Sequence, residues 1–330
     1  MRNVIAIEEH IVVPDDAHVA LWRDSVPMIP DAGIAATRPV LEDVGANRLA
    51  AMDNTGIDLA ILSNVGTVQP LLDRLMAERM AAEANDYLAG VVAGRPDRYQ
   101  GFATIALQDP EAGAIELERA VKGLGLRGVM LFGPTNGLYL DHPRFEVFWS
   151  AVEALDVPVF LHPATPPVFP ANLVGREELA GAVWGWTMET GTHFLRLVFG
   201  GVFDRHPNAR VILGHLGETI PYLAARLDSR ARAMGWYSGS GKTPSRFLRD
   251  NLLVATSGVF SDPPLRCAIS TLGAENIMFA LDYPFESQSE ATDWFDGAEM
   301  SGYERGLIGR SNAERVFALA TDPSVRALRH

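Results

Sequence analysis

Short apolar runs recur along the chain, and a stretch with helical periodicity follows most of them. Near-continuous runs such as VPVFLH (157–162) and ARVILGH (209–215) are typical of strands buried on both faces of a parallel sheet. We predict eight such strands, over residues 4–7, 58–63, 101–106, 126–132, 157–161, 210–213, 252–256 and 277–281.

The segments between the predicted strands have the three- and four-residue spacing of amphipathic helices. In segment 71–92, Leu72, Met76 and Met80 follow this spacing, and Gly94 ends the pattern. The same reasoning predicts helices over 111–124, 144–155, 221–234 and 264–272.

Eight strands that alternate with helices predict a parallel α/β fold. No glycine-rich phosphate-binding fingerprint follows the first strand, which disfavours an open dinucleotide-binding sheet. We therefore predict a (β/α)8 TIM barrel, with residues 1–330 as a single domain. Segments 22–44 and 163–184 look like loop insertions at the C-terminal face of the strands, where such barrels build their active sites.

Composition narrows the function classes. The 330 residues include 28 Lys and Arg against 41 Asp and Glu, a formal net charge of −13, which opposes a nucleic-acid or anionic-membrane surface. Cys267 is the only cysteine, so no intrachain disulfide can form, as suits a reducing compartment. No secretory leader or apolar span of membrane length stands out. We expect a soluble cytoplasmic protein that binds neither nucleic acid nor membranes.

Polar residues follow four of the apolar runs. Glu8 and His10 end the first run, and strand alternation places residues two apart on one face. His162, His215 and Asp282 end three later runs, and in a barrel all these ends meet at one mouth. A single histidine at a strand end is usually structural, but ligand-type residues at four ends favour a shared metal site. Imidazoles with carboxylates suit Zn²⁺ or Mn²⁺.

His215 belongs to a second unit, LGHLGET, with Glu218 three residues later at a strand-to-helix turn. The two side chains could meet there, with Glu218 orienting the imidazole and favouring its protonated form. Alternatively, Glu218 only complements the dipole of a helix that starts at this turn. We favour the paired interpretation.

Several stretches together carry a family resemblance: IEEH (7–10), NRLAAMDNTGID (47–58), GRPDRYQGFATIALQDP (94–110), DVPVFLHP (156–163), WTMETGTHFLRL (186–197), FDRHPNARVILGHLGETIPYLAARLD (203–228) and LDYPFE (281–286). With these motifs the sequence resembles the amidohydrolase superfamily, specifically its γ-resorcylate (2,6-dihydroxybenzoate) and 2,3-dihydroxybenzoate decarboxylases. The stretches cover nearly the whole chain in family order.

The resemblance implies one divalent ion per subunit, Mn²⁺ or Zn²⁺, and no organic cofactor. Its implied metal ligands are Glu8, His10, His162 and Asp282.

It also implies that Asp282 is catalytic, together with the pair His215 and Glu218. Phe285 is expected to form an aromatic wall for the substrate, and Arg226 to reach the site of a neighbouring subunit. The resemblance also favours a homodimer or a homotetramer.

The implied activity is non-oxidative decarboxylation of an ortho-hydroxy aromatic carboxylic acid, in which Asp282 protonates the ring before CO₂ leaves. The alternatives are a barrel without catalytic activity and, more commonly in the superfamily, hydrolysis of a small carboxylated ring substrate by metal-activated water. Hydrolases usually carry HxH in the first strand, whereas this chain has Glu8-x-His10, which favours decarboxylation. Tyr283 stands where the family has tryptophan, so the resemblance does not fix the ring substituents.

Overall fold

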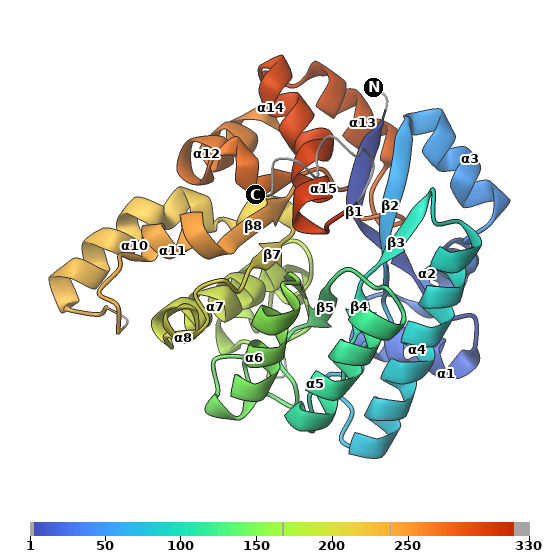
Figure 1. The fold of residues 1–330 in the computed structure, drawn as a ribbon, viewed down its shortest axis with the longest axis horizontal. Coiled ribbons are helices and arrows are strands. Elements are labelled where there is room, and N and C mark those ends of the chain that lie inside the picture. Colours follow the sequence, from blue (N-terminus) through green and yellow to red (C-terminus); the bar gives the residue numbers. More distant parts are fainter. Residues whose placement is uncertain (1–2, 167, 238, 320–330) are drawn as a thin grey trace.

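Parallel strands form an inner ring that helices cover on the outside (Figure 1). This structure, a computed structural model, describes residues 3–166, 168–237 and 239–319. One sheet has the order β1-β2-β3 and the other β4-β5-β6-β7-β8-β9, and all neighbouring strands pair in parallel. The strands are β1 Val4–Ile11, β2 Ile57–Asn64, β3 Tyr99–Gly101, β4 Ala103–Thr104, β5 Val129–Phe132, β6 Val159–His162, β7 Val211–Leu213, β8 Leu252–Ala255 and β9 Ile277–Met278.

Strands β3 and β4 are two halves of one barrel strand, which we predicted as a single run. The Phe102 amide between them donates to the Leu62 carbonyl (2.9 Å), and the Ala103 amide donates to the Gly128 carbonyl (2.8 Å). The two sheets are therefore continuous at this point.

The ring closes where the chain after β9 meets β1. The Ile7 amide donates to the Phe279 carbonyl (3.2 Å), and the Asp282 amide donates to the Glu8 carbonyl (3.0 Å). Counting β3 and β4 together, eight strands close on themselves, and the predicted (β/α)8 barrel is confirmed.

The predicted helices are present, with boundaries shifted by a few residues. For example, segment 71–92 becomes Arg74–Gly94, because the Asp73 side chain accepts a hydrogen bond from the Met76 amide (3.1 Å) and so caps the first turn. The α-helices are α1 Asp16–Ser25, α2 Asp31–Glu42, α3 Ala46–Thr55, α4 Arg74–Gly94, α5 Pro110–Glu118, α6 Glu146–Leu155, α7 Gly185–Phe199, α8 Val202–Arg205, α9 His215–Glu218, α10 Ile220–Met234, α11 Pro244–Asn251, α12 Asp262–Leu272, α13 Gln288–Gly297, α14 Gly302–Gly306 and α15 Asn312–Val316.

Shorter helical turns complete the chain. Two are π-helical, η1 Arg119–Gly123 and η6 Leu307–Ser311, and four are 3₁₀ turns, η2 Pro143–Phe145, η3 Ala171–Leu173, η4 Glu177–Leu179 and η5 Ala274–Asn276. No helix in the described ranges is both long and apolar enough to cross a membrane.

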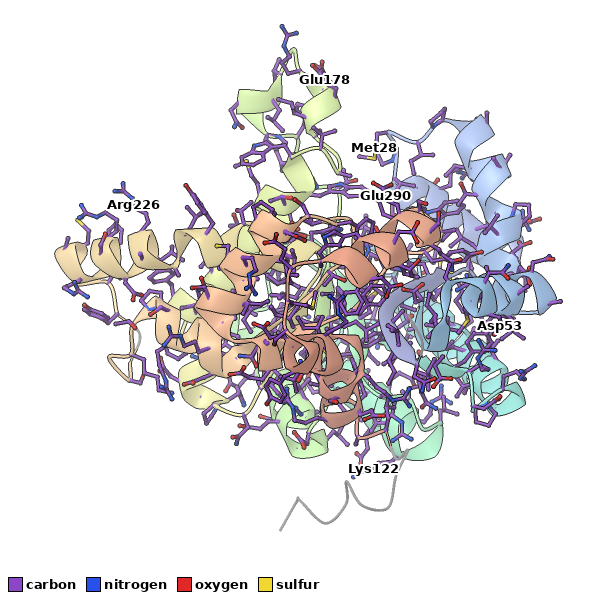
Figure 2. All side chains as sticks on the ribbon, turned by 90° about the horizontal axis from the view of Figure 1, so that it is seen from above. Met28, Asp53, Lys122, Glu178, Arg226 and Glu290 are labelled. Atoms are coloured by element: carbon purple, nitrogen blue, oxygen red, sulfur yellow. The ribbon has the colours of Figure 1, made fainter. Side chains whose placement is uncertain are left out.

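The two insertions lie on one side of the barrel. Segment 22–44, expected as a loop, contains the end of α1 and all of α2, whereas the helical elements in the described part of segment 163–184 are the turns η3 and η4. Met28 of the first insertion and Glu178 of the second project on the same side in Figure 2, opposite Lys122. Both insertions therefore cover the mouth at the C-terminal ends of the strands.

Successive residues of a strand pack alternately inside the barrel and against the surrounding helices. In β6, Phe160 faces the barrel interior with Phe102 and Ile212, while Val159 and Leu161 face the surrounding helices. The interior is thus filled by side chains, as this architecture requires.

We expect the substitution Phe160→Ala to lower the free energy of unfolding by about 3–5 kcal/mol, because it leaves a cavity where a fully buried ring was packed. Chemical denaturation measures this change. The matched surface substitution Ile115→Ala, at a side chain that is 71% exposed, should change the unfolding free energy by less than about 0.5 kcal/mol. Equal effects of the two substitutions would contradict the assignment of Phe160 to the barrel core.

Candidate metal centre and active site

Four side chains converge at the mouth of the barrel. Glu8 and His10 come from β1, His162 is the last residue of β6, and Asp282 follows β9. One ligand-type atom from each residue lies within 4.8 Å of all the others. The structure therefore brings together the four residues that the sequence suggested as metal ligands.

A bulge in β1 turns Glu8 and His10 toward this mouth. Ala6 pairs with Ala60, and Glu9 pairs with Leu62. Between these two pairs, β1 therefore contains one residue more than β2. Before the bulge, even-numbered residues such as Ala6 pack against the outer helices. After the extra residue the alternation is reversed, and the even-numbered Glu8 and His10 face inward.

The converging atoms are buried and have no well-directed hydrogen bond among the described residues. They are Glu8 Oε1, His10 Nε2, His162 Nε2 and Asp282 Oδ1. His10 Nε2 lies 3.0 Å from Asp282 Oδ1, and His162 Nε2 lies 3.6 Å from Glu8 Oε1. Because buried polar atoms are rarely left without a partner, this donor set fits a divalent cation.

Neighbouring groups hold the opposite ends of these ligands. Ser63 Oγ lies 2.9 Å from His10 Nδ1, and His162 Nδ1 donates to the Pro163 carbonyl (2.9 Å). Ser257 Oγ donates to Glu8 Oε2. Such contacts fix the imidazole tautomer and leave the Nε2 lone pair of His162 free for a metal. Sequence reasoning missed both serines, although Ser63 ends one predicted strand and Ser257 directly follows another.

Burial shifts the pKa values of two of the ligands. Burial raises the pKa of Glu8 to about 8, against a lowering effect of nearby His215. Burial also lowers the pKa of His162 to about 3, so its imidazole is neutral. A neutral histidine is ready to bind metal, and a bound cation would keep Glu8 ionised.

His215 and Glu218 form the predicted pair. His215 Nδ1 lies 2.6 Å from Glu218 Oε1, and the Glu218 side chain is buried. Residues from His215 to Thr219 all have positive φ, so α9 is a strained turn, and the regular helix α10 begins only at Ile220. Ser257 Oγ anchors this strained turn by accepting a hydrogen bond from the His215 amide (3.2 Å).

The pair reaches the metal ligands through Asp282, since His215 Nε2 lies 4.0 Å from Asp282 Oδ2. Burial lowers the pKa of His215, but the Glu218, Asp282 and Glu8 carboxylates together outweigh this effect and hold the pKa well above its ordinary value. Burial raises the pKa of Asp282, yet the His10 and His215 imidazoles outweigh it and hold that pKa well below its ordinary value. The arrangement places an imidazolium beside a carboxylate.

A cavity of about 290 Å³ opens beside these groups. Its wall includes Phe285, whose ring centroid lies 5.7 Å from that of His10 and 6.4 Å from that of Trp22. Sequence reasoning named Phe285 but missed the other aromatic residues of the wall. The remaining lining is mostly apolar: Trp22, Ser25, Val26, Met28, Ile29, Val65, Thr67, Phe132, His162, Pro163, Ala164, Ala182, Trp186, Asp282 and Glu286.

Arg226 lies far from this cavity. It is exposed on α10, which extends away from the body of the barrel (Figure 2). The chain therefore does not bring Arg226 to its own site.

Comparisons with known proteins agree with this geometry. The family model described as "Amidohydrolase" matches residues 15–319. The chain is 38% identical to the gamma-resorcylate decarboxylase of Rhizobium sp. (strain MTP-10005), over 97% of this chain and 99% of that protein. Its fold is similar to the crystal structure of a 2,6-dihydroxybenzoate decarboxylase complexed with 2,6-dihydroxybenzoate, with a TM-score of 0.90 and 37% identity over 97% of this chain and 100% of the other.

A further similar structure is a dihydroxybenzoic acid decarboxylase from Polaromonas sp. JS666 with bound manganese and the inhibitor 2-nitroresorcinol. It has a TM-score of 0.88 and 38% identity, over 97% of this chain and 98% of the other.

We expect His162→Ala to weaken metal binding by at least about 100-fold, because it removes one buried ligand atom from the set. Elemental analysis after dialysis against a limiting chelator gives the metal content. His142→Ala, which removes an exposed histidine away from the site, is the matched control and should leave the content unchanged. Equal metal content in both variants would remove His162 from the ligand set.

Proposed function

The chain belongs to the amidohydrolase family, and on that basis we propose that it is a metal-dependent carboxy-lyase that removes CO₂ from an ortho-hydroxy aromatic carboxylic acid. The observation that carries this proposal is the position of Asp282. It borders the cavity, lies within the cluster of four ligand-type residues and is within 4.0 Å of His215.

The proposed ion is Mn²⁺, held by Glu8, His10, His162 and Asp282. Manganese in the similar Polaromonas structure supports this choice over Zn²⁺, and the mixed nitrogen and oxygen donors suit either ion. When bound, the ion would fix the substrate through its carboxylate and ortho oxygens and stabilise their negative charge.

Asp282 delivers the proton in the proposed reaction, after its ionised carboxylate has taken that proton from the adjacent His215 imidazolium. The proton goes to the ring carbon that bears the carboxylate, so that this carbon is no longer part of the aromatic system. The bond to the carboxylate then breaks, its electron pair returns to the ring, and CO₂ leaves. Each turnover consumes one proton. His215 is neutral after it has given its proton to Asp282 Oδ2, and it then takes up another from solvent, which the Glu218 carboxylate favours by stabilising the imidazolium.

The lining supports this chemistry over hydrolysis. Trp22, Phe132 and Phe285 give the cavity three aromatic walls that suit a planar ring and limit the access of water. The similar proteins named above are decarboxylases, and this chain has Glu8 where superfamily hydrolases usually have a histidine. These observations favour a lyase.

Further proposals concern the protein as a whole. We propose one domain over residues 1–330, which the family match over 15–319 supports, and function in the cytoplasm, which the single cysteine supports. We also propose a homodimer or a homotetramer in which Arg226 serves the partner subunit's site. The exposed position of Arg226 on a projecting helix supports this, together with the exposed Tyr222 and Leu223 nearby on α10.

We expect Asp282→Asn to lower kcat for CO₂ release from 2,6-dihydroxybenzoate by about 100- to 10,000-fold, because the amide cannot donate a proton as a carboxylic acid does. Circular dichroism and metal content establish that the variant is folded and loaded. Near-normal turnover by a loaded variant would exclude Asp282 as the proton donor. Parallel assays of the wild-type protein with small lactones test the hydrolase alternative, which requires lactone turnover without CO₂ release.

Mixed oligomers test the role of Arg226. Arg226→Ala and Asp282→Asn should each be nearly inactive alone. Co-expressed in equal amounts they should recover about a quarter of the wild-type activity, because half of the dimers are mixed and each mixed dimer has one complete site. Separately tagged chains allow the mixed species to be purified. No recovery in purified mixed oligomers would place Arg226 outside the partner's site.

A further inference from the structure

A second cavity adjoins the substrate cavity and shares part of its wall. It has a volume of about 340 Å³, and four of its lining residues, Ser25, Thr67, Phe132 and Ala164, also line the first cavity. We propose that this side cavity is a subsite for an uncharged substituent on the ring of the substrate. The inference rests on the proposed function and narrows its substrate class.

The partition between the two cavities is made mostly of small side chains. Ser25, Thr67 and Ala164 present a hydroxymethyl, a hydroxyethyl and a methyl group, and only Phe132 is large. A ring in the first cavity can therefore extend a chain of a few atoms past them. The Ala164 methyl group packs closely on Gly133, where a Cβ would lie only 2.7 Å from it.

Hydrogen bonds hold the frame of the side cavity in place. Thr165 Oγ1 donates to the Ser25 carbonyl (2.9 Å) and so joins the two insertions across the cavity. On the far side, Thr67 Oγ1 donates to Gln69 Oε1 (2.7 Å), and the backbone amide of Asn136 donates to the backbone carbonyl of Gln69 (3.1 Å). Binding there requires little ordering of the chain, which favours a preformed subsite.

The lining determines the chemistry of the occupant. Pro27, Pro70 and Pro134 give rigid apolar walls, and the polar groups at the edge are Asp24, Asn136 and Thr165. Within the described lining there is no lysine or arginine, and the one charged group is the Asp24 carboxylate. A second carboxylate on the substrate would be repelled, whereas an alkyl or hydroxyalkyl chain would bury apolar surface.

The test compares 2-hydroxybenzoate and 2,6-dihydroxybenzoate with 2-hydroxybenzoates that carry a propyl group at position 4, 5 or 6. For the metal-loaded wild-type protein, at least one propyl isomer should have a kcat/KM within about threefold of its parent compound. A loss above about 100-fold for all three isomers is expected for a closed wall and would overturn the proposal.

Two alanine substitutions locate the subsite. Ala164→Leu places a larger side chain in the shared partition and should lower kcat/KM for the accepted propyl isomer at least about tenfold more than for the parent. Ala182→Leu is the matched control, because Ala182 lines the substrate cavity but not the side cavity. It should affect parent and propyl compound equally. The assignment would be overturned if the two variants had the same ratio of kcat/KM for the parent to kcat/KM for the propyl compound.

Binding without turnover separates this proposal from the proposed function. Dissociation constants of resorcinol and propyl-substituted resorcinols can be measured by calorimetry on the same proteins, whether or not they release CO₂. Ala164→Leu should weaken the propyl compound selectively. If the wild-type protein decarboxylates no benzoate but shows this selective loss, the subsite stands and the reaction is wrong. If it decarboxylates the parent acids without any selective loss, the reaction stands and the subsite is wrong.

Discussion

The active site depends on one extra residue in the first strand. Without the bulge between Ala6 and Glu9, Glu8 and His10 would continue the outward face of β1 and pack against helices. A buried carboxylate in that position would have no cation and no water, which is strongly unfavourable. The bulge turns both side chains inward, and the hydrogen bond from the Asp282 amide to the Glu8 carbonyl then fixes Asp282 beside them.

Further hydrogen bonds reinforce the seam of the barrel, where β1 meets the chain after β9. The Glu9 carboxylate, which faces away from the mouth, accepts a hydrogen bond from the Leu281 amide (3.2 Å), and the buried Arg48 guanidinium donates to the His10 carbonyl. Barrel closure and ligand geometry therefore rest on the same few backbone groups. A glycine at position 214 completes the arrangement, because a Cβ there would lie only 3.0 Å from Glu8 Oε2. The chain just after β7 therefore approaches the glutamate so closely that a side chain here would displace it.

The sequence predicted the chemistry of the site better than its shape. His162 and Asp282 were identifiable because polar, ligand-type residues at the ends of several buried apolar strands rarely serve packing alone. The bulge was not identifiable, since the run VIAIEEH has the pattern of an ordinary strand and its reversal of alternation depends on pairing with β2. Ser63 and Ser257 carry no signal of their own, because serine ends many strands.

The insertions were the least predictable part. Segment 22–44 was expected as a loop because of its prolines, but Pro30 only precedes α2, and Pro39 lies within that helix. The Asp15 side chain, which caps α1 by accepting hydrogen bonds from the Ala17 and His18 amides, was a usable helix signal in the sequence. Which of these residues would line a cavity could not be predicted from periodicity. Trp22 reaches the site through its packing with Val12, Ile34 and Val65, and Ser25 is joined by its carbonyl to Thr165 of the other insertion.

The strand ends and the insertions have separate roles in this fold. The strand ends fix the atoms that bind metal and move a proton, and any barrel with this bulge and seam would have them. The insertions decide which ring enters and what it carries, and they can change without disturbing the strands. The described lining contains no lysine or arginine, so other groups must balance the charge of a carboxylate substrate. These groups are the cation, the His215 imidazolium and, in the proposed assembly, Arg226 of the partner subunit. The cavity walls themselves then remain free to select the ring by shape and by apolar contact.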